Sequence, residues 1–270
     1  MPEGDTVFHT ATRLRAALAG SVLRHAQLRH PRLSTMELTG RTVSGVRSVG
    51  KHLFLRFDDE LSLHHHLMMD GGWSIDPLGT RWRRPGHQAR VVLRTDEVEA
   101  VGFLLHEMRM VRVAEEDRLV AHLGPDLLDP AWDDDMAALA AARLAAEPSR
   151  ALGEALLDQR VLAGVGNVYK SEVCFLLGVT PWTPVSEVDT GEAVRLSHDL
   201  LYRNRNRDRY DRNTTGQRGR GRGVWVYGRS KRAQGCLRCG GPVRVAEQGE
   251  ELRERVTYWC PRCQSGPGPD

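Results

Sequence analysis

The sequence contains no run of about 18 consecutive apolar residues, the length that a membrane-spanning helix requires. Its charged start is not followed by the apolar segment of a secretory signal peptide, and no internal repeat is visible. These absences predict a soluble, cytoplasmic protein without a membrane partner, and they argue against a repeat architecture.

Lysine is scarce: Lys51, Lys170 and Lys231 are the only three in 270 residues, and arginine takes its place almost everywhere else. The net charge of +3 conceals a strong segregation of charge along the chain. Residues 126–135 carry five aspartates, whereas residues 201–235 carry eleven basic residues against two acidic ones. Such a basic block indicates a polyanionic partner, with a solvated arginine-rich loop as the alternative.

Cysteine is also sparse, but four of the five cysteines form two Cys-x2-Cys pairs, Cys236 with Cys239 and Cys260 with Cys263. This spacing is typical of a zinc site with four thiolate ligands, and two disulfides are the alternative. Zinc is favoured because nothing at the chain start indicates secretion. Four thiolates leave no open position for water, so the zinc would be structural. Cys174 lies in an apolar run and is predicted to be a buried thiol.

The pattern of apolar residues predicts an α+β protein of two or three units. A helix over residues 7–18 is followed, across residues 21–115, by short alternating runs separated by Gly, Pro and Asp clusters. That alternation is typical of an antiparallel β-sandwich. Helical patterns then cover residues 137–146, 151–160 and 168–177, with two glycines breaking the chain before the last of them.

The chain start has the composition of a small catalytic site. Removal of Met1 would leave the secondary amine of Pro2 next to the carboxylate of Glu3. An α-amino group, with a pKa of about 7.7–8.0, is far less protonated near neutral pH than a lysine at about 10.4, so it is the better nucleophile. Asp5 is predicted to cap the first helix, whose dipole would lower the pKa of the amine further. A solvated end without chemistry is the alternative.

A glycine-broken turn over residues 162–167 precedes the helix that begins near Asn167. Backbone N–H groups and an amide side chain at a helix start can hold a phosphate. An ordinary helical corner is the alternative for this segment.

Four segments together resemble the formamidopyrimidine-DNA glycosylase and endonuclease VIII family. They occur in the family's order and span nearly the whole chain; they are residues 2–4 (Pro-Glu-Gly), 50–52 (Gly-Lys-His), 156–169 and 258–264. The resemblance implies a DNA repair enzyme with three parts: an N-terminal β-sandwich, a helix–two-turn–helix domain and a four-cysteine zinc finger on a β-hairpin. We expect these parts to cover residues 1–125, 126–225 and 226–270.

The resemblance also implies how the residues act. Pro2 would attack C1′ of a damaged nucleotide to give a Schiff base, and Glu3 would move protons on the opening sugar, so that β,δ-elimination can follow. Lys51 matches a catalytic lysine that contacts a phosphate beside the lesion, although a solvated strand residue is the alternative. Asn167 matches a phosphate-binding asparagine. Arg255, five residues before Cys260, matches the zinc-finger arginine that grips the DNA backbone at the catalytic site.

The loop after residue 66 matches the one that fills the gap left by an extruded base, with Met69 as the wedge. His64 and His66 share a strand face and could hold a metal, but carboxylate partners at matching spacing are not evident. Asp70 departs from the family pattern, and the segment around Arg109 lacks the Arg-Arg-Phe motif of the guanine-directed branch. This absence favours the endonuclease VIII branch and oxidised pyrimidines over 8-oxoguanine.

The expected partner is damaged double-stranded DNA, bound by a monomer with one structural Zn²⁺. Three alternatives remain: a glycosylase directed to 8-oxoguanine and formamidopyrimidine, a non-catalytic damage-binding protein of the same fold, and a zinc-ribbon transcription or structural protein. The last of these leaves the Pro-Glu start and the glycine-broken helix pair unexplained.

Overall fold

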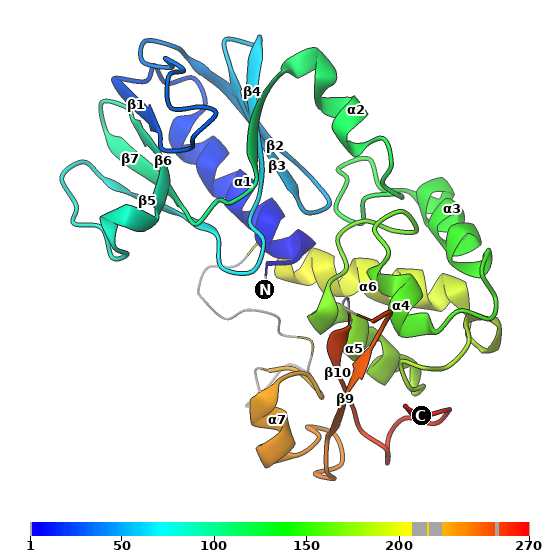
Figure 1. The fold of residues 1–270 in the computed structure, drawn as a ribbon. Coiled ribbons are helices and arrows are strands. Elements are labelled where there is room, and N and C mark those ends of the chain that lie inside the picture. Colours follow the sequence, from blue (N-terminus) through cyan, green and yellow to red (C-terminus); the bar gives the residue numbers. More distant parts are fainter. Residues whose placement is uncertain (1, 207–214, 216–222, 252–253, 270) are drawn as a thin grey trace. The chain divides into compact units, whose positions relative to one another are not determined.

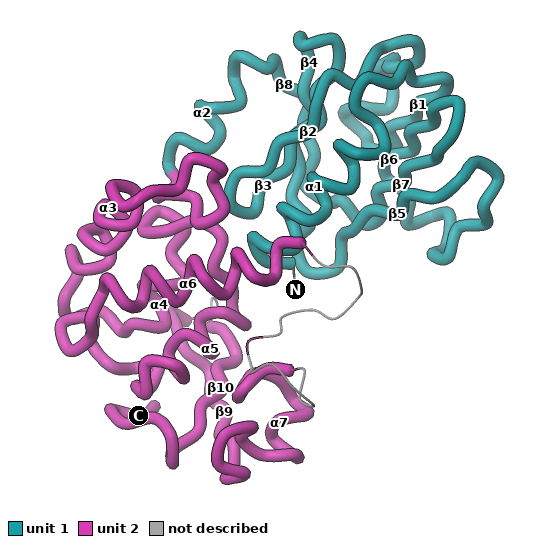
Figure 2. Tube along the Cα trace, turned by 180° about the vertical axis from the view of Figure 1, so that it is seen from behind, with its two compact units in different colours: residues 1–122 teal, residues 123–270 magenta. Residues whose placement is uncertain are grey.

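The computed structural model describes residues 2–206, 215, 223–251 and 254–269 (Figure 1). The chain divides into two compact units, residues 1–122 and 123–270 (Figure 2). Across the described residues, every helix is too short or too polar to cross a membrane. Six of the eleven basic residues in the block at residues 201–235 fall on positions 207–214 and 216–222, which lie outside the described residues.

Unit 1 consists of one long helix, two antiparallel four-stranded sheets and a short helix, in agreement with the predicted β-sandwich. The first sheet has the order β2 (Val43–Val49), β3 (His52–Phe57), β4 (Leu61–His66) and β8 (Met108–Arg112). The second sheet has the order β1 (His25–Leu28), β6 (Ala89–Arg94), β7 (Val98–Phe103) and β5 (Gly72–Pro77). The helices are α1 (Gly4–Leu18) and α2 (Glu116–Val120), with 3-10 turns at Gly86–Gln88 and Val113–Glu115.

Helix α1 provides one side of the core of unit 1. Its apolar residues Val7, Ala11, Leu14 and Leu18 recur every three or four positions and are almost fully buried. They belong to one hydrophobic cluster with residues of both sheets, and α1 contacts β2, β3 and β5. Burial of each leucine stabilises the unit by about 1.5–3 kcal/mol, which fixes the helix and the chain start that precedes it.

Among its described residues, unit 2 contains the helices α3 to α7 and a C-terminal hairpin that is flanked by the cysteine pairs. The helices are α3 (Asp134–Ala145), α4 (Leu152–Leu157), α5 (Asn167–Leu177), α6 (Thr190–Asn204) and α7 (Arg229–Gln234), with a 3-10 turn at Val185–Glu187. Strands β9 (Arg244–Gln248) and β10 (Arg255–Trp259) pair antiparallel. Asp133 and Asp189 cap α3 and α6 through their side chains. Helix α5 ends at Gly178, whose φ of 75° suits glycine.

Two local predictions differ from the structure. Glu3, not Asp5, occupies the N-cap position of α1, and Asp5 lies buried in the first turn, where the helix dipole also favours a carboxylate. The helix predicted over residues 151–160 is shorter in the structure, where it is α4. It ends at Leu157, because the backbone of Asp158 is extended. The division into three parts at residues 125 and 225 stays a prediction.

Candidate functional site

The chain start is held rigidly by the first turn of α1. Pro2 and Glu3 are buried, and the Glu3 carbonyl oxygen accepts hydrogen bonds from the N–H groups of Thr6 and Val7 at 2.9 and 3.0 Å. The backbone of Glu3 is extended and its carboxylate makes no capping hydrogen bond to the helix. Residue 2 therefore projects from the positive end of a 15-residue helix dipole.

Lys51 lies in the turn between β2 and β3 and not within a strand. Gly50, which precedes it, has a φ of 54°, a conformation that glycine adopts without the cost of a side chain. Lys51 is half-buried. Burial lowers the pKa of His66, and the positive charge of Lys51 lowers it further. The two side chains therefore lie close enough for their charges to interact.

The loop between β4 and β5 presents two exposed methionines. Met69 is 62% exposed and Met68 is 44% exposed, with an unusual φ of 50° at Met68. Gly71 makes the loop possible, because a Cβ there would lie 2.4 Å from the Leu67 carbonyl oxygen. The Asp70 carbonyl oxygen accepts a hydrogen bond from Arg84 at 2.9 Å. A tightly folded loop thus presents a flexible apolar side chain at its surface.

Three histidines meet on one face of β3 and β4. The sequence placed His64 and His66 together; the structure adds His52, which pairs with His66 across the strands. The His52 Nδ1 and His64 Nε2 atoms are 2.9 Å apart. Burial, followed by the charge of a protonated His66, lowers the pKa of His52 to about 3 and that of His64 to about 4. Both rings are therefore neutral near pH 7.

In unit 2, the side chain of Asn167 bonds to the backbone of the residue that follows Arg255. Asn167 is the first residue of α5 and is 5% exposed, and its Nδ2 donates to the Val256 carbonyl oxygen at 2.7 Å. The fully buried Lys170 donates through Nζ to the Thr257 hydroxyl. These bonds attach α5 to β10, where Arg255 is the exposed first residue.

Asn167 keeps one unsatisfied polar atom. Its Oδ1 is buried and has no hydrogen-bond partner in the part of the chain that the structure describes. Sequence reasoning missed Lys170, because its link to β10 joins residues 87 positions apart.

Glu172 is a second residue of α5 that sequence reasoning missed. Its fully buried carboxylate accepts hydrogen bonds from the N–H groups of Trp225, Val226 and Tyr227 at 2.7 to 3.0 Å, and from the Thr215 hydroxyl. Burial raises the pKa of this carboxyl, although all of these bonds oppose the shift. Glu172 thus anchors to α5 the segment that leads into the cysteine-rich end of the chain.

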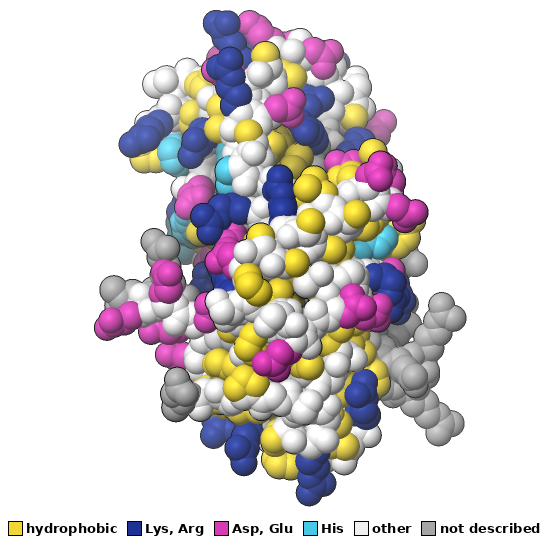
Figure 3. Space-filling model, turned by 90° about the vertical axis from the view of Figure 1, so that its right-hand side faces the viewer, with side chains coloured by type: hydrophobic (Ala, Val, Ile, Leu, Met, Phe, Trp, Pro, Cys, Tyr) yellow, Lys and Arg dark blue, Asp and Glu magenta, His cyan; other side chains and the backbone are white. Residues whose placement is uncertain are grey.

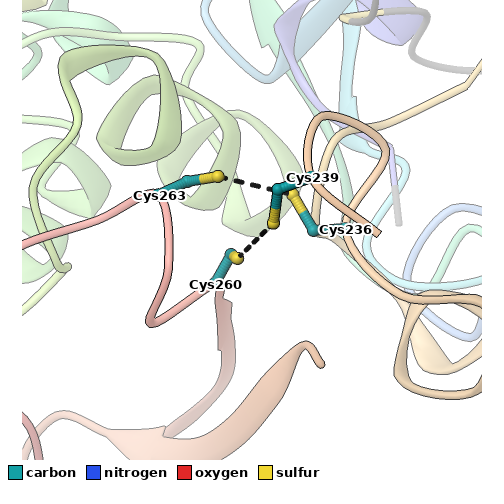
Figure 4. Close-up of side chains that lie close together, drawn as sticks. All are labelled: Cys236, Cys239, Cys260 and Cys263. Carbon is teal, nitrogen blue, oxygen red and sulfur yellow. Dashed lines mark hydrogen bonds between the residues drawn. The ribbon is translucent and has the colours of Figure 1, made fainter. Parts of the chain in front are cut away.

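The four predicted metal-ligating cysteines converge from two loops (Figure 4). Their sulfur atoms all lie within 4.8 Å of one another, with Cys236 and Cys263 at 3.9 Å and Cys239 and Cys260 at 3.5 Å. A tetrahedron with zinc–sulfur bonds of about 2.3 Å has edges of about 3.8 Å, whereas a disulfide needs about 2.0 Å. The spacing therefore fits a four-coordinate metal and not two disulfides. Cys174 lies apart and is fully buried, as predicted.

One face of the molecule carries side chains of both charges. On the face shown in Figure 3, Lys and Arg side chains alternate with Asp and Glu side chains and with apolar ones. Arg255 is one of the exposed cations among the described residues.

Comparisons with known proteins agree along the whole chain. The formamidopyrimidine-DNA glycosylase N-terminal domain matches residues 1–124, and the H2TH domain of the same enzyme matches residues 123–202. A probable endonuclease 8 2 of Streptomyces coelicolor is 55% identical over 100% of this chain and 96% of its own length. The DNA-(apurinic or apyrimidinic site) lyase Nei2 of Mycolicibacterium smegmatis is 46% identical over 98% of this chain and 99% of its own.

A solved structure of Lactococcus lactis Fpg, bound to DNA that contains N7-benzyl-Fapy-dG, has the same fold. Its TM-score is 0.77 at 21% sequence identity, with 98% of this chain and 100% of that chain covered. The sandwich, the helical domain and the hairpin with four cysteines are thus shared with proteins of one family, and similarity in sequence covers nearly every residue. The chain belongs to the formamidopyrimidine-DNA glycosylase and endonuclease VIII family.

Proposed function

We propose that this protein excises oxidised pyrimidines from damaged double-stranded DNA through a Schiff base on the Pro2 nitrogen. As a member of its family, the chain is a bifunctional DNA glycosylase and DNA-(apurinic or apyrimidinic site) lyase of base-excision repair. The observation that carries the proposed mechanism is the buried Pro2-Glu3 start at the N-terminus of α1. We expect the protein to act as a monomer in the bacterial cytoplasm.

The proposed reaction starts from the free amine that remains once Met1 is removed. The Pro2 nitrogen attacks C1′, a nitrogen–carbon bond forms, and the bond from C1′ to the base breaks. Glu3 protonates the sugar ring oxygen as the ring opens and later accepts a proton. The helix dipole of α1 opposes protonation of the amine, which keeps it nucleophilic near neutral pH.

The Schiff base then acts as an electron sink for strand cleavage. Loss of a proton from C2′ expels the 3′ phosphate, and a second elimination expels the 5′ phosphate. Both steps need an intermediate that is held in place while bonds to phosphate break. The hydrogen bonds from Thr6 and Val7 to the Glu3 carbonyl oxygen fix the chain start, which supports Pro2 as the residue that holds the intermediate.

Three side chains are proposed to hold the DNA backbone. Lys51 and Arg255 contribute positive charge, and Asn167 contributes an amide whose second Nδ2 hydrogen can donate to a phosphate oxygen. The bonds from α5 to β10 support this assignment, because they hold Asn167 and Arg255 at a fixed separation. Met69 is proposed to fill the gap that the extruded nucleotide leaves, which its exposed position on a shaped loop supports.

The four cysteines are proposed to bind one Zn²⁺. Four thiolates are the usual ligands of structural zinc and leave no position for a reactive water. The ion would stabilise the loops that flank the β9–β10 hairpin, and so the position of Arg255. No chemical step requires it.

The proposed preference for oxidised pyrimidines depends on the segment around β8. Residues 106–111 lack the Arg-Arg-Phe motif of the guanine-directed branch, and Met108 in this segment is only 8% exposed. The similarity to proteins named endonuclease 8 2 and Nei2 supports the same branch.

Borohydride trapping tests the mechanism directly. On duplex DNA with thymine glycol, the mature chain should give a covalent adduct that maps to the peptide beginning at Pro2. The matched control is a chain that retains Met1, in which the Pro2 nitrogen is an amide and cannot attack. Equal trapping by the control would refute Pro2 as the nucleophile.

A further inference from the structure

Three imidazole rings converge on the outer face of the first sheet, opposite the hydrophobic core. In the β3–β4 register His52 pairs with His66 and Phe54 pairs with His64, so alternation of side chains puts all three histidines on the same face. The ring nitrogens that they offer lie within 4.8 Å of one another. The buried residues on the other face of these strands, Leu53, Leu55 and Leu63, belong to the core.

The rings are held in place before any ligand arrives. His52 and His64 are 8% and 5% exposed, and the His64 ring stacks on Phe54 with centroids 4.7 Å apart. The His66 ring packs edge-on against His52 at 4.0 Å. Buried, packed ligands lose little conformational freedom on binding, which favours affinity.

A cavity of about 840 Å³ opens onto these rings. Its lining also includes His122, whose ring centroid lies 6.0 Å from that of His52, and Glu107. Neither belongs to the group of three whose ligand atoms lie within 4.8 Å of one another. Arg109, which pairs with His64 across β4 and β8, lines the same cavity and contributes a positive charge.

We propose that His52, His64 and His66 form a second metal site, which takes a divalent first-row transition metal such as Zn²⁺, Co²⁺ or Ni²⁺. Neutral imidazoles suit these ions. With metal–nitrogen bonds of about 2.0–2.1 Å, the ligand atoms lie about 3.3 Å apart. The observed separations, from 2.9 Å to at most 4.8 Å, bracket that value. The remaining position faces the cavity.

The site lies between two loops to which the proposed function assigns DNA contacts. His52 directly follows Lys51, and His66 comes three residues before Met69. An ion that joins β3 to β4 would restrain the ends of both loops and add positive charge near Lys51. Because Arg109 repels the ion, the histidine site should bind metal more weakly than the four cysteines do. Its occupancy should therefore depend on the concentration of free metal.

Cobalt titration tests the site in the intact protein whose four-cysteine site already holds zinc. One additional equivalent of Co²⁺ should bind per chain, with the weak visible bands of nitrogen and oxygen ligands and without sulfur charge-transfer bands. The midpoint of thermal unfolding should rise with Co²⁺ and then saturate. Wild-type protein that binds no second equivalent overturns the proposal, whatever the variants do.

Two variants and a control locate the ion. His64→Phe keeps a ring to stack on Phe54, and His66→Gln changes the half-buried member of the set; each should weaken binding of the second equivalent at least tenfold. His87→Ala, at an exposed histidine in the 3-10 turn before β6, should bind as the wild type does. If His64→Phe does not fold, His66→Gln carries the same expectation. A second equivalent that persists at full affinity in every folded variant overturns the assignment.

Discussion

Glu3 combines two features that are unusual together: it is fully buried, and its carboxylate is not used to cap the helix that it precedes. A carboxylate at a helix N-terminus is favoured by the helix dipole. The proposed reaction uses this carboxylate for proton transfer on the sugar.

Glu3→Gln should slow base excision by about 10²- to 10⁴-fold, because the amide keeps the shape but cannot transfer the proton. DNA affinity should change little. Single-turnover excision and fluorescence titration with the same duplex measure the two quantities. Glu97→Gln, at an exposed loop glutamate, is the matched control and should excise at the wild-type rate. A Glu3→Gln protein that excises as fast as this control would remove Glu3 from the mechanism.

Lys51 and Arg255 differ from Asn167 in charge, and this difference is measurable. Each cation that pairs with a phosphate adds about 0.9 to the slope of log K against log salt on duplex DNA. Lys51→Ala and Arg255→Ala should each flatten that slope by about one, whereas Asn167→Ala should weaken binding and leave the slope nearly unchanged. Titrations at several salt concentrations give the slopes. Wild-type slopes in both charge variants would contradict the phosphate contacts.

Between α4 and α5, the turn is held by a carboxylate that sequence reasoning passed over. The Asp158 side chain is 9% exposed and accepts hydrogen bonds from Arg160 and Arg150 at 2.7 and 3.1 Å. The hydrogen bond from Arg160, with help from Arg150, holds the pKa of Asp158 well below its ordinary value. The turn precedes Asn167, so its shape fixes where α5 begins.

Asp158→Asn should destabilise unit 2 by about 1–3 kcal/mol near neutral pH, since charge-assisted hydrogen bonds are lost. Because the folded-state pKa is depressed, this stabilisation is present above the unfolded pKa of about 3.9 and disappears as pH falls through the folded value. The difference in unfolding free energy between wild type and variant should therefore shrink below about pH 4. Urea unfolding at pH 7, 5 and 3 measures it. A difference that does not vary with pH would assign the effect to packing.

Elements with strong local signals were predictable from the sequence. Apolar and polar residues alternate clearly over β3, β4 and β6, and α5 ends at a glycine. The Cys-x2-Cys pairs indicate the candidate metal ligands on either side of the β9–β10 hairpin. Helix α6, which has 15 residues, was not predicted, although Asp189 caps it and Glu192 follows three residues later.

Contacts between distant residues could not be predicted in the same way. The meeting of His52 with His64 depends on the β3–β4 register, and the bond from Lys170 to Thr257 depends on how α5 meets β10. Register and packing are set by the whole core, and no short segment encodes them. The proposed site residues come from the resemblance to the family's motifs, and their roles stay predictions.

At the scale of the whole molecule, the core of unit 1 and the C-terminal end of unit 2 differ in size. Unit 1 has a large hydrophobic core, whereas the C-terminal part of unit 2 has a small cluster around Phe175, Tyr258 and two of the four cysteines, Cys236 and Cys260. Such a small cluster needs a metal or another crosslink to stay folded.

Removal of zinc should therefore unfold the hairpin selectively. After treatment with a strong chelator, lyase activity and DNA affinity should fall together, because Arg255 loses its position, while the thermal transition of unit 1 persists. Circular dichroism, elemental analysis and strand-cleavage assays on the same sample test this. The control is re-addition of one equivalent of Zn²⁺, which should restore activity; active protein that contains no metal would refute the zinc site.

The proposed function involves residues of both units, because it assigns the sugar chemistry to Pro2 and Glu3 and phosphate contacts to Asn167 and Arg255. In that proposal the chain lacks Arg-Arg-Phe and Met69 fills most of the gap, and an apolar wedge makes no specific hydrogen bonds to an orphaned cytosine. Discrimination should then follow the ease with which a base leaves the stack, which is greatest where stacking is already weak. Thymine glycol fits because its saturated ring is not planar.

Single-turnover excision should therefore be faster on thymine glycol than on 8-oxoguanine opposite cytosine, in duplexes that are otherwise identical. Met69→Ala should reduce both rates, since it removes the wedge, whereas Met36→Ala, at a half-buried methionine outside the loop, should reduce neither. Preformed abasic sites need no base excision, so strand cleavage there should depend less on the lesion context. A clear preference for 8-oxoguanine opposite cytosine would place the protein in the guanine-directed branch and leave the Pro2 chemistry untouched, because attack at C1′ does not involve the base that departs.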